Sequence, residues 1–263
     1  MPLNPISTLD DPRVADYRYT TDHKRLTERS LFVAEGRLVV RQLLHLRQWN
    51  LHSILLTAAA AANLEDALPL TDVPVYVIDP ALMNAIAGFD IHRGCLALAH
   101  RPMVPSFDFV ASGPLSRVLV MEGVSNPDNV GGIFRSAAAF GVDLVVLGPA
   151  CGDPLYRKAI RTSMAATLAV PFATARQWPG AITDLKTDGF TVVALTPEPH
   201  AVALRDVPRH AKLALVVGAE GAGLTEAALA ASTFQVRIPM TPAIDSLNVT
   251  TAASIAMYHC WQR

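Results

Sequence analysis

Apolar residues recur at two different spacings along this chain, and each spacing predicts a different kind of element. Near the carboxyl end they stand at offsets of 0, 3, 4, 7, 8 and 11 residues, which places them on one face of an α-helix. The residues on this face are Val249, Ala252, Ala253, Ala256, Met257 and Cys260. The stretch 238–258 is therefore expected to leave a strand, pass through a polar turn and continue as a long helix.

The second pattern consists of continuous apolar runs without a period, and five of them follow one another after residue 116. Runs of this kind are typical of parallel strands that are buried on both faces of a sheet. They cover residues 118–124, 144–149, 191–196, 213–218 and 234–240, and helical segments are expected near 129–140, 153–167, 180–187, 223–231 and 248–261. The second half of the chain thus predicts an α/β fold with a mostly parallel sheet and helices on both sides.

The first hundred residues predict a smaller α/β domain. Apolar and basic residues interleave at helical spacing over 36–49, and buried strands are expected over 52–57, 73–79 and 95–100, with a short helix over 80–87. Residues 101–115 contain three prolines and have no clear period, which is typical of a linker. We therefore expect a domain over 1–103, a linker over 104–115 and a second domain over 116–263.

Composition adds limits on the class of protein. A chain that is 51% hydrophobic and 17% charged can bury a substantial core and does not resemble a disordered chain. No apolar run reaches the roughly 18 residues that a membrane helix needs, and the first residues lack the order of a signal peptide. A cytoplasmic protein without a membrane partner is the expectation.

Charge is distributed unevenly, although the formal net charge is only −1. Residues 13–47 carry eight lysines and arginines against four acidic residues, a net of +4. Such a segment is ordinarily a solvated face, but in this chain it is also the best candidate for contact with phosphates. The three cysteines are far apart and the eight histidines are scattered, so the sequence implies no metal site.

Ligands of parallel α/β sheets bind at the carboxyl ends of the strands, so the loops there are where chemistry is expected. The first loop, after 118–124, contains Asn129, two consecutive glycines and then Arg135. Asp128 or Asn129 would cap a helix, and Arg135 near the start of that helix is suited to a phosphate or a developing oxyanion. A capped helix with an exposed arginine is the plain structural alternative.

The second and third loops follow the strands 213–218 and 234–240. In the second, GAEGAGL has glycines spaced GxxGxG, which is neither a dinucleotide fingerprint nor a phosphate-cradling P-loop, and this argues against an NAD-type oxidoreductase. Its Glu220 would point at the ligand edge or cap the next helix. The third loop carries Asp245, Ser246 and Asn248, which would either cap the last helix or form a ligand loop.

The three loops closely resemble, in order and spacing, the three motifs of the SpoU (TrmH-type) RNA 2′-O-methyltransferases of the SPOUT superfamily. They read NPDNVGGIFRSA, then VVGAEGAGL, then IPM followed by SLNVTTAAS. The resemblance covers nearly all of residues 116–263, and the stretches FVAEGRLVVRQLL and GFDIHRGCLALAH also look like the family's ribosomal-protein-like RNA-binding domain. It implies a SPOUT-type sheet whose carboxyl-terminal segment forms a deep trefoil knot, one of the few exceptions to the absence of knots.

The resemblance also implies roles for individual residues. S-adenosylmethionine would lie in the knot against Gly218, Ile238 and Leu247, with Met240 nearby. The family's catalytic and substrate-holding positions fall on Asn129, Arg135, Glu220, Ser246 and Asn248. The family acts as a homodimer with its sites at the interface, so the apolar face of the last helix would be buried either in the knotted core or at the dimer contact.

The chemistry that the resemblance implies is attack of a ribose 2′-hydroxyl on the sulfonium methyl group, which requires positioning and removal of one proton. A guanidinium is a poor base, so Arg135 is expected to hold the adjacent RNA phosphate and stabilise the developing alkoxide. Two departures from the family pattern are Pro242, where glycine is usual, and Ala219, where Asn or Ser is frequent. They bear on cofactor affinity, since neither removes a catalytic side chain.

The sequence therefore predicts a methyltransferase that acts on a ribose 2′-oxygen in structured RNA. Ribosomal RNA is preferred over transfer RNA, because two-domain members of the family mostly modify the large ribosomal subunit. A tRNA methyltransferase remains an alternative, as does an RNA-binding or ribosome-assembly protein without turnover.

Overall fold

The computed structural model describes residues 2–91, 94–107, 115–241 and 244–261, and its contacts divide the chain into two compact units. The first unit comprises Met1–Pro102 and Leu155–Leu168, and the second Met103–Pro154 and Ala169–Arg263. The chain therefore passes between the units three times. Much of the predicted linker, residues 108–114, lies outside the described residues; Ser106 pairs with Thr174 in a bridge and Phe107 is buried in the second unit.

The first unit is built on a mixed five-stranded sheet with the order β1-β4-β3-β5-β2. Its strands are β1 (Leu3–Ile6), β2 (Leu31–Glu35), β3 (Leu51–Leu56), β4 (Val75–Ile78) and β5 (Cys95–His100). Its helical elements are η1 (Pro12–Tyr19), α1 (His23–Glu28), α2 (Arg37–Leu46), α3 (Ala58–Asn63), η2 (Leu68–Leu70), α4 (Pro80–Ala87) and α7 (Arg157–Thr162). Strands β3, β4 and β5 confirm the three predicted strands, whereas β1 and β2 were not predicted.

Helix α7 belongs to the first unit through side chains that are far away in sequence. Arg157 Nη1 lies 2.6 Å from Glu35 Oε2, and both side chains are largely buried. The Arg157 guanidinium also lies 4.3 Å from the ring centroid of Phe89, a cation–π contact. These contacts explain why α7 packs against β2, although Arg157 and Glu35 are 122 residues apart in sequence.

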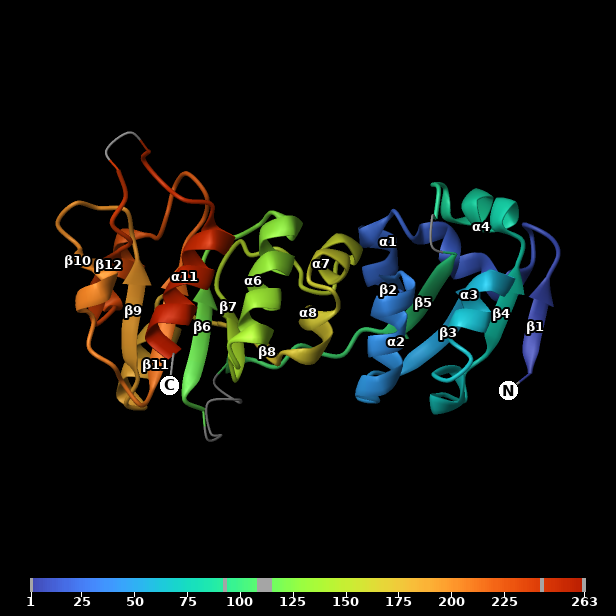
Figure 1. Ribbon diagram of the computed structural model, residues 1–263, viewed down its shortest axis with the longest axis horizontal. Coiled ribbons are helices and arrows are strands. Elements are labelled where there is room, and N and C mark those ends of the chain that lie inside the picture. The colour runs from blue at the N-terminus through green and yellow to red at the C-terminus, as the bar shows by residue number, and fades with distance from the viewer. Residues whose placement is uncertain (1, 92–93, 108–114, 242–243, 262–263) are drawn as a thin grey trace. The chain divides into compact units, whose positions relative to one another are not determined.

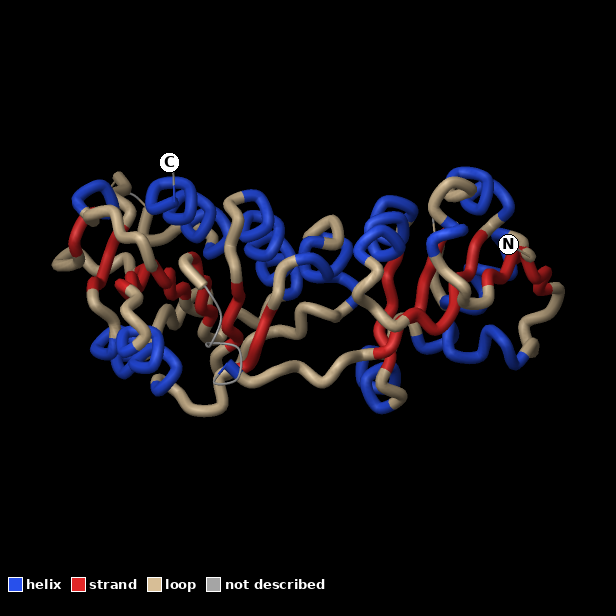
Figure 2. Tube along the Cα trace, turned by 90° about the horizontal axis from the view of Figure 1, so that it is seen from below, coloured by secondary structure: helices blue, strands red, loops and turns tan. Residues whose placement is uncertain are grey.

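The second unit is a seven-stranded sheet with the order β10-β12-β9-β11-β6-β7-β8, and every described strand pair in it is parallel. The strands are β6 (Arg117–Met121), β7 (Leu144–Leu147), β8 (Phe172–Thr174), β9 (Thr191–Leu195), β10 (Val202–Ala203), β11 (Leu213–Val217) and β12 (Phe234–Arg237). The helical elements are α6 (Pro127–Ala139), α9 (Gly180–Thr187), η3 (Leu204–Asp206), α10 (Glu226–Ala231) and α11 (Val249–Trp261). Helix α8 (Ala166–Ala169) belongs to the first unit as far as Leu168. Figure 2 shows helices on both faces of this sheet, as predicted.

Two local predictions about helices were wrong. Helix α6 is capped by Asn126, whose side chain accepts from the backbone N–H of Asp128, and neither Asp128 nor Asn129 is the cap. The single helix expected over 153–167 is divided into α7 and α8, because Met164 and Ala165 take left-handed backbone angles with φ of 53° and 70°. Residues other than glycine rarely adopt that backbone conformation, so the pattern of apolar residues did not predict the break in the helix.

The apolar face of α11 is buried within the second unit. Val249, Ala253, Ala256, Met257 and Cys260 are at most 9% exposed, and α11 packs against α6 and β11. Figure 1 shows α11 beside α6, and Gly132 permits this approach because a Cβ there would lie 2.7 Å from Thr250 Cγ2. Of the two expectations for this face, core and dimer contact, these residues serve the core.

Within the described residues, no helix combines the length and apolar character needed to span a bilayer.

Asp143, just before β7, makes a testable contribution to stability. Burial alone would raise its pKa, but hydrogen bonds from the backbone N–H groups of Ser116 and Arg117 outweigh that effect and lower the pKa below 3.8. A carboxyl whose pKa is lowered in the folded state stabilises it above the unfolded pKa, and this contribution is lost as the pH falls through the folded pKa. We expect Asp143→Asn to lower the free energy of unfolding by about 1 kcal/mol near neutral pH, since the group remains partly solvated.

Urea unfolding of both proteins across the acid range measures this effect. The difference between them should shrink below pH 3.8 and vanish once the wild-type carboxyl is protonated. Asp184→Asn, which removes an exposed carboxyl on α9, is the matched control. A difference for Asp143→Asn that persists unchanged in acid would contradict the charge as the cause.

Candidate functional site

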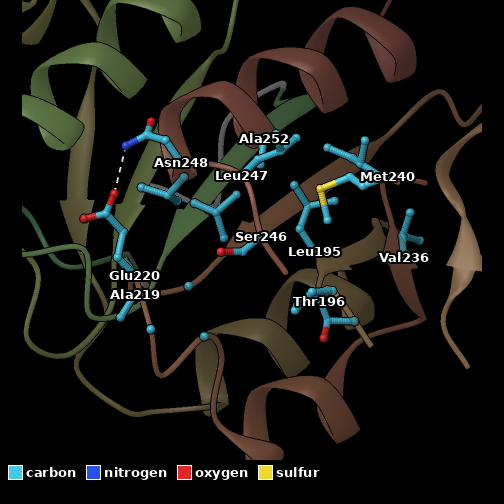
Figure 3. A pocket seen from close by; sticks show the side chains of 17 residues that line it. Leu195, Thr196, Ala219, Glu220, Val236, Met240, Ser246, Leu247, Asn248 and Ala252 are labelled. Carbon is cyan, nitrogen blue, oxygen red and sulfur yellow. Dashed lines mark hydrogen bonds between the residues drawn. The ribbon is translucent and has the colours of Figure 1, made fainter. Parts of the chain in front are cut away.

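A pocket of about 350 Å³ opens at the carboxyl ends of β9, β11 and β12. Three segments line it: Leu195–Pro197 at the end of β9, the glycine-rich loop after β11, and Ser246–Asn248 before α11. Ile238 and Met240, which follow β12, together with Val236, Val249 and Ala252, supply apolar walls. Figure 3 shows these side chains converging on one cavity from elements that are distant in sequence. The pocket therefore lies where a parallel sheet is expected to bind a ligand.

Asn248 joins the polar residues at the edge of this pocket. Its Nδ2 group donates to Asn129 Oδ1 at 2.9 Å and to Glu220 Oε1 at 2.8 Å, the second bond being drawn in Figure 3. Its Oδ1 accepts from the backbone N–H of Thr250 at 3.0 Å, which caps α11. The sequence left capping and ligand binding as alternatives for this turn, and the same side chain both caps the helix and links the three loops.

Gly218 makes the tight return of the second loop possible. A Cβ at this position would lie 2.4 Å from the carbonyl carbon of Gly223 and 2.5 Å from the backbone nitrogen of Leu224. The return is closed by a hydrogen bond of 3.0 Å from the Gly223 N–H to the Ala219 carbonyl. Only a residue without a side chain allows the two strands of the loop to approach this closely.

The sequence pattern of the SpoU rRNA Methylase family matches residues 116–258, which includes all three loops of the pocket. The chain belongs to this family. The SpoU family predicted from the motifs is thereby confirmed, and so is the methyltransferase class of enzyme.

Relatives of this SpoU-family chain extend the similarity to its first unit. A Mycobacterium bovis protein named an uncharacterized tRNA/rRNA methyltransferase is 43% identical over 256 residues, covering 95% of this chain and 88% of the relative. The 23S rRNA (guanosine(2553)-2′-O)-methyltransferase RlmP of Bacillus subtilis is 26% identical and covers 98% of this chain and 99% of its own. The crystal structure of an AdoMet-bound rRNA methyltransferase from Sinorhizobium meliloti has the same fold, with a TM-score of 0.81 at 24% identity over 98% of this chain and 97% of that one.

The structure brings most of the predicted site residues of this SpoU-family chain to one place. The pocket is lined by seven of them, namely Gly218, Glu220, Ile238, Met240, Ser246, Leu247 and Asn248. Asn129 does not line the pocket, but its Oδ1 accepts a hydrogen bond from Asn248. Arg135 is exposed on α6 and does not line the pocket. Of the two departures from the family pattern, Ala219 lines the pocket and Pro242 lies outside the described residues.

One part of the pocket, at the end of β9, was not predicted from the sequence. Leu195, Thr196 and Pro197 lie at the end of a predicted strand, yet they belong to none of the three motifs. Strand β9 stands between β11 and β12 in the sheet. The rule that ligands lie at the carboxyl edge would have nominated this loop if the strand order had been known.

The positive charge of residues 13–47 is largely paired with acidic side chains. Ion pairs join Arg13 to Asp11, Arg18 to Asp10, Lys24 to Glu28, Arg25 to Asp22, Arg29 to Asp16, and Arg41 to Asp66. Three of these acids, Asp10, Asp11 and Asp66, lie outside the segment whose charge was counted. Contact of this segment with RNA phosphates stays a prediction, and its excess of positive charge is smaller in the fold than in the sequence.

Proposed function

We propose that this protein transfers a methyl group from S-adenosylmethionine to a ribose 2′-hydroxyl of RNA. The observation that carries the proposal is the joining of the three family motifs around one pocket by the Asn248 side chain, with bonds to Glu220 and Asn129. The name of the Bacillus subtilis relative, which matches this chain along nearly its whole length, specifies 2′-O-methylation. Both observations favour the ribose oxygen as the acceptor.

The pocket suits S-adenosylmethionine in size and chemistry. Its volume of about 350 Å³ lies within the range of small-molecule sites, and apolar walls such as Leu195, Ile238 and Met240 would receive the adenine ring. Gly218, Gly221 and Gly223 leave backbone groups accessible along one side, where no side chain intervenes. When bound, S-adenosylmethionine supplies an electrophilic methyl group on a sulfonium.

The chain's own residues then have separate tasks. Asn248 holds the Glu220 carboxylate and the Asn129 amide in fixed positions at the pocket edge. Arg135, which is exposed on α6, is free to meet an RNA phosphate with its planar fork of donors and to stabilise negative charge on the ribose oxygen. Ser246, also exposed at the pocket, would hold the substrate. The proton of the hydroxyl leaves to a phosphate oxygen or to water.

Ribosomal RNA is the substrate we favour. The support is the name of the full-length relative RlmP, which acts on 23S rRNA, while the Mycobacterium bovis relative carries the broader name tRNA/rRNA methyltransferase. The first unit, with its own five-stranded sheet, is proposed to select the RNA.

The trefoil knot stays a prediction. So does the homodimer, for which Ile255 and Tyr258 on α11, 39% and 56% exposed, are candidate contacts; sedimentation showing only monomer would contradict it.

The test is methyl transfer from labelled S-adenosylmethionine to total rRNA and total tRNA from a strain that lacks this protein. We expect label in rRNA, and we expect Arg135→Ala to lower the rate by about a hundredfold or more, as for loss of a charge-stabilising donor. Arg135→Lys keeps the charge but not the fork, and near-normal turnover by this variant would argue against a fork-specific role. Label in tRNA alone would select the alternative substrate, and no label in either would favour a binding protein without turnover.

A further inference from the structure

Glu122 is a buried carboxylate that the proposed reaction does not use. It directly follows β6, is 4% exposed and does not line the pocket. Its backbone N–H donates to the Val217 carbonyl at 2.9 Å, at the end of β11. A buried carboxylate is costly unless its oxygens are satisfied, so its partners indicate its role.

Three donors converge on the two oxygens of Glu122. The indole Nε1 of Trp178 and the hydroxyl of Thr225, at 2.8 Å, donate to Oε1. The backbone N–H of Thr225 donates to Oε2 at 2.9 Å. Both oxygens must therefore be acceptors. An amide of the same shape would turn an N–H group toward at least one of these donors.

Thr225 is the residue at which the second pocket loop ends and α10 begins. Its Oγ1 accepts from the Ala228 N–H as the helix cap while its hydroxyl hydrogen goes to Glu122. The loop from Gly218 to Gly223 lies between the two places that Glu122 holds, which are Val217 before it and Thr225 after it. Five residues of this loop line the pocket: Gly218, Ala219, Glu220, Gly221 and Gly223.

We infer that Glu122 is a positioning residue that sets the shape of the second loop for the cofactor, an inference that rests on the proposed binding of S-adenosylmethionine in this pocket. The Glu122 carboxylate holds Thr225 at the far end of this glycine-rich segment, and the backbone N–H of the same residue holds Val217 at the near end. The Glu122 side chain does not line the pocket, and its described hydrogen bonds do not involve Asn248, Asn129 or Glu220. Its loss should therefore change the affinity for the cofactor and leave turnover at saturating cofactor nearly intact.

Calorimetric titration of S-adenosylmethionine into Glu122→Gln tests the inference. We expect the Kd to rise about tenfold, the effect of losing one charge-assisted hydrogen bond at the loop. The KM for S-adenosylmethionine should rise in parallel, whereas kcat and the KM for RNA should stay within about twofold of wild type. Glu226→Gln, the same substitution on the exposed first turn of α10, is the matched control and should bind as wild type does.

Thr225 provides a second pair of variants in case Glu122→Gln does not fold. Thr225→Val removes the hydroxyl donor and should raise the Kd, and Thr225→Ser keeps the donor and should restore it. A purely structural role would lower the fraction of protein that binds and leave the Kd unchanged, and that result would overturn the inference. Wild type that binds S-adenosylmethionine while Glu122→Gln binds equally well would overturn this inference alone. Wild type that fails to bind would overturn the proposed function with it.

Discussion

Gly218→Ala should weaken binding of S-adenosylmethionine by about a hundredfold, since a shift of about 1 Å at a site can cost that much. The added methyl group would lie 2.4 Å from the Gly223 carbonyl carbon and 2.5 Å from the Leu224 nitrogen. Both are backbone atoms, so no side chain can turn away to make room, and the loop that lines the pocket must open. Calorimetry with the cofactor measures the change directly.

Gly180→Ala is the control for this substitution. Its Cβ would meet only the Gln177 side chain, at 3.3 Å from Cβ, and Gly180 begins α9 outside the pocket. It should bind the cofactor as the wild type does. Gly218→Ala with unchanged affinity would contradict the assignment of this loop to the cofactor.

Asn248→Asp should lower kcat/KM by about a hundredfold while leaving the thermal stability close to that of the wild type. The aspartate keeps an oxygen that can accept from the Thr250 N–H, so the cap of α11 survives. The aspartate lacks the N–H donors to Asn129 and Glu220. It also places a second carboxylate beside that of Glu220, whose Oε1 lies 2.8 Å from Asn248 Nδ2 in the wild type. The polar group that joins the three motifs would separate.

Asn248→Ala distinguishes the two roles of this side chain. It removes the cap as well as the bridge, so it should add a loss of about 1 kcal/mol in stability to the loss of activity. Steady-state kinetics and thermal unfolding of both variants give the comparison. Full activity in Asn248→Asp would mean that Asn248 is a helix cap and nothing more.

The sequence was most informative where one physical rule acts alone. Five of the seven strands of the second unit were predicted, because continuous apolar runs are typical of parallel strands that are buried on both faces of a sheet. Strands β8 and β10 were not predicted, because Phe172–Thr174 and Val202–Ala203 are too short to form a recognisable apolar pattern. The position of the pocket could be predicted, because parallel strands place their following loops at one edge of the sheet. The contribution of the loop after β9 could not, because it depends on the position of β9 between β11 and β12 in the strand order.

Features that depend on contacts distant in sequence could not be predicted. The packing of α7 with the first unit rests on Arg157 and Glu35, which are 122 residues apart. The bond from Asn248 to Asn129 spans 119 residues, so the motifs nominated both residues without showing that they touch. The pairing of Arg41 with Asp66 is similar, because a charge count along one segment does not register an acid outside it.

The acceptor of the methyl group is proposed to be a ribose 2′-oxygen. Alkaline hydrolysis of RNA labelled by the wild-type protein tests it, because a methylated 2′-oxygen cannot attack the neighbouring phosphate and the linkage after it survives. We predict that the label is recovered in alkali-stable dinucleotides and that its amount falls by about a hundredfold or more when Arg135→Ala replaces the wild type. Label recovered in mononucleotides would place the methyl group on a base and contradict the account.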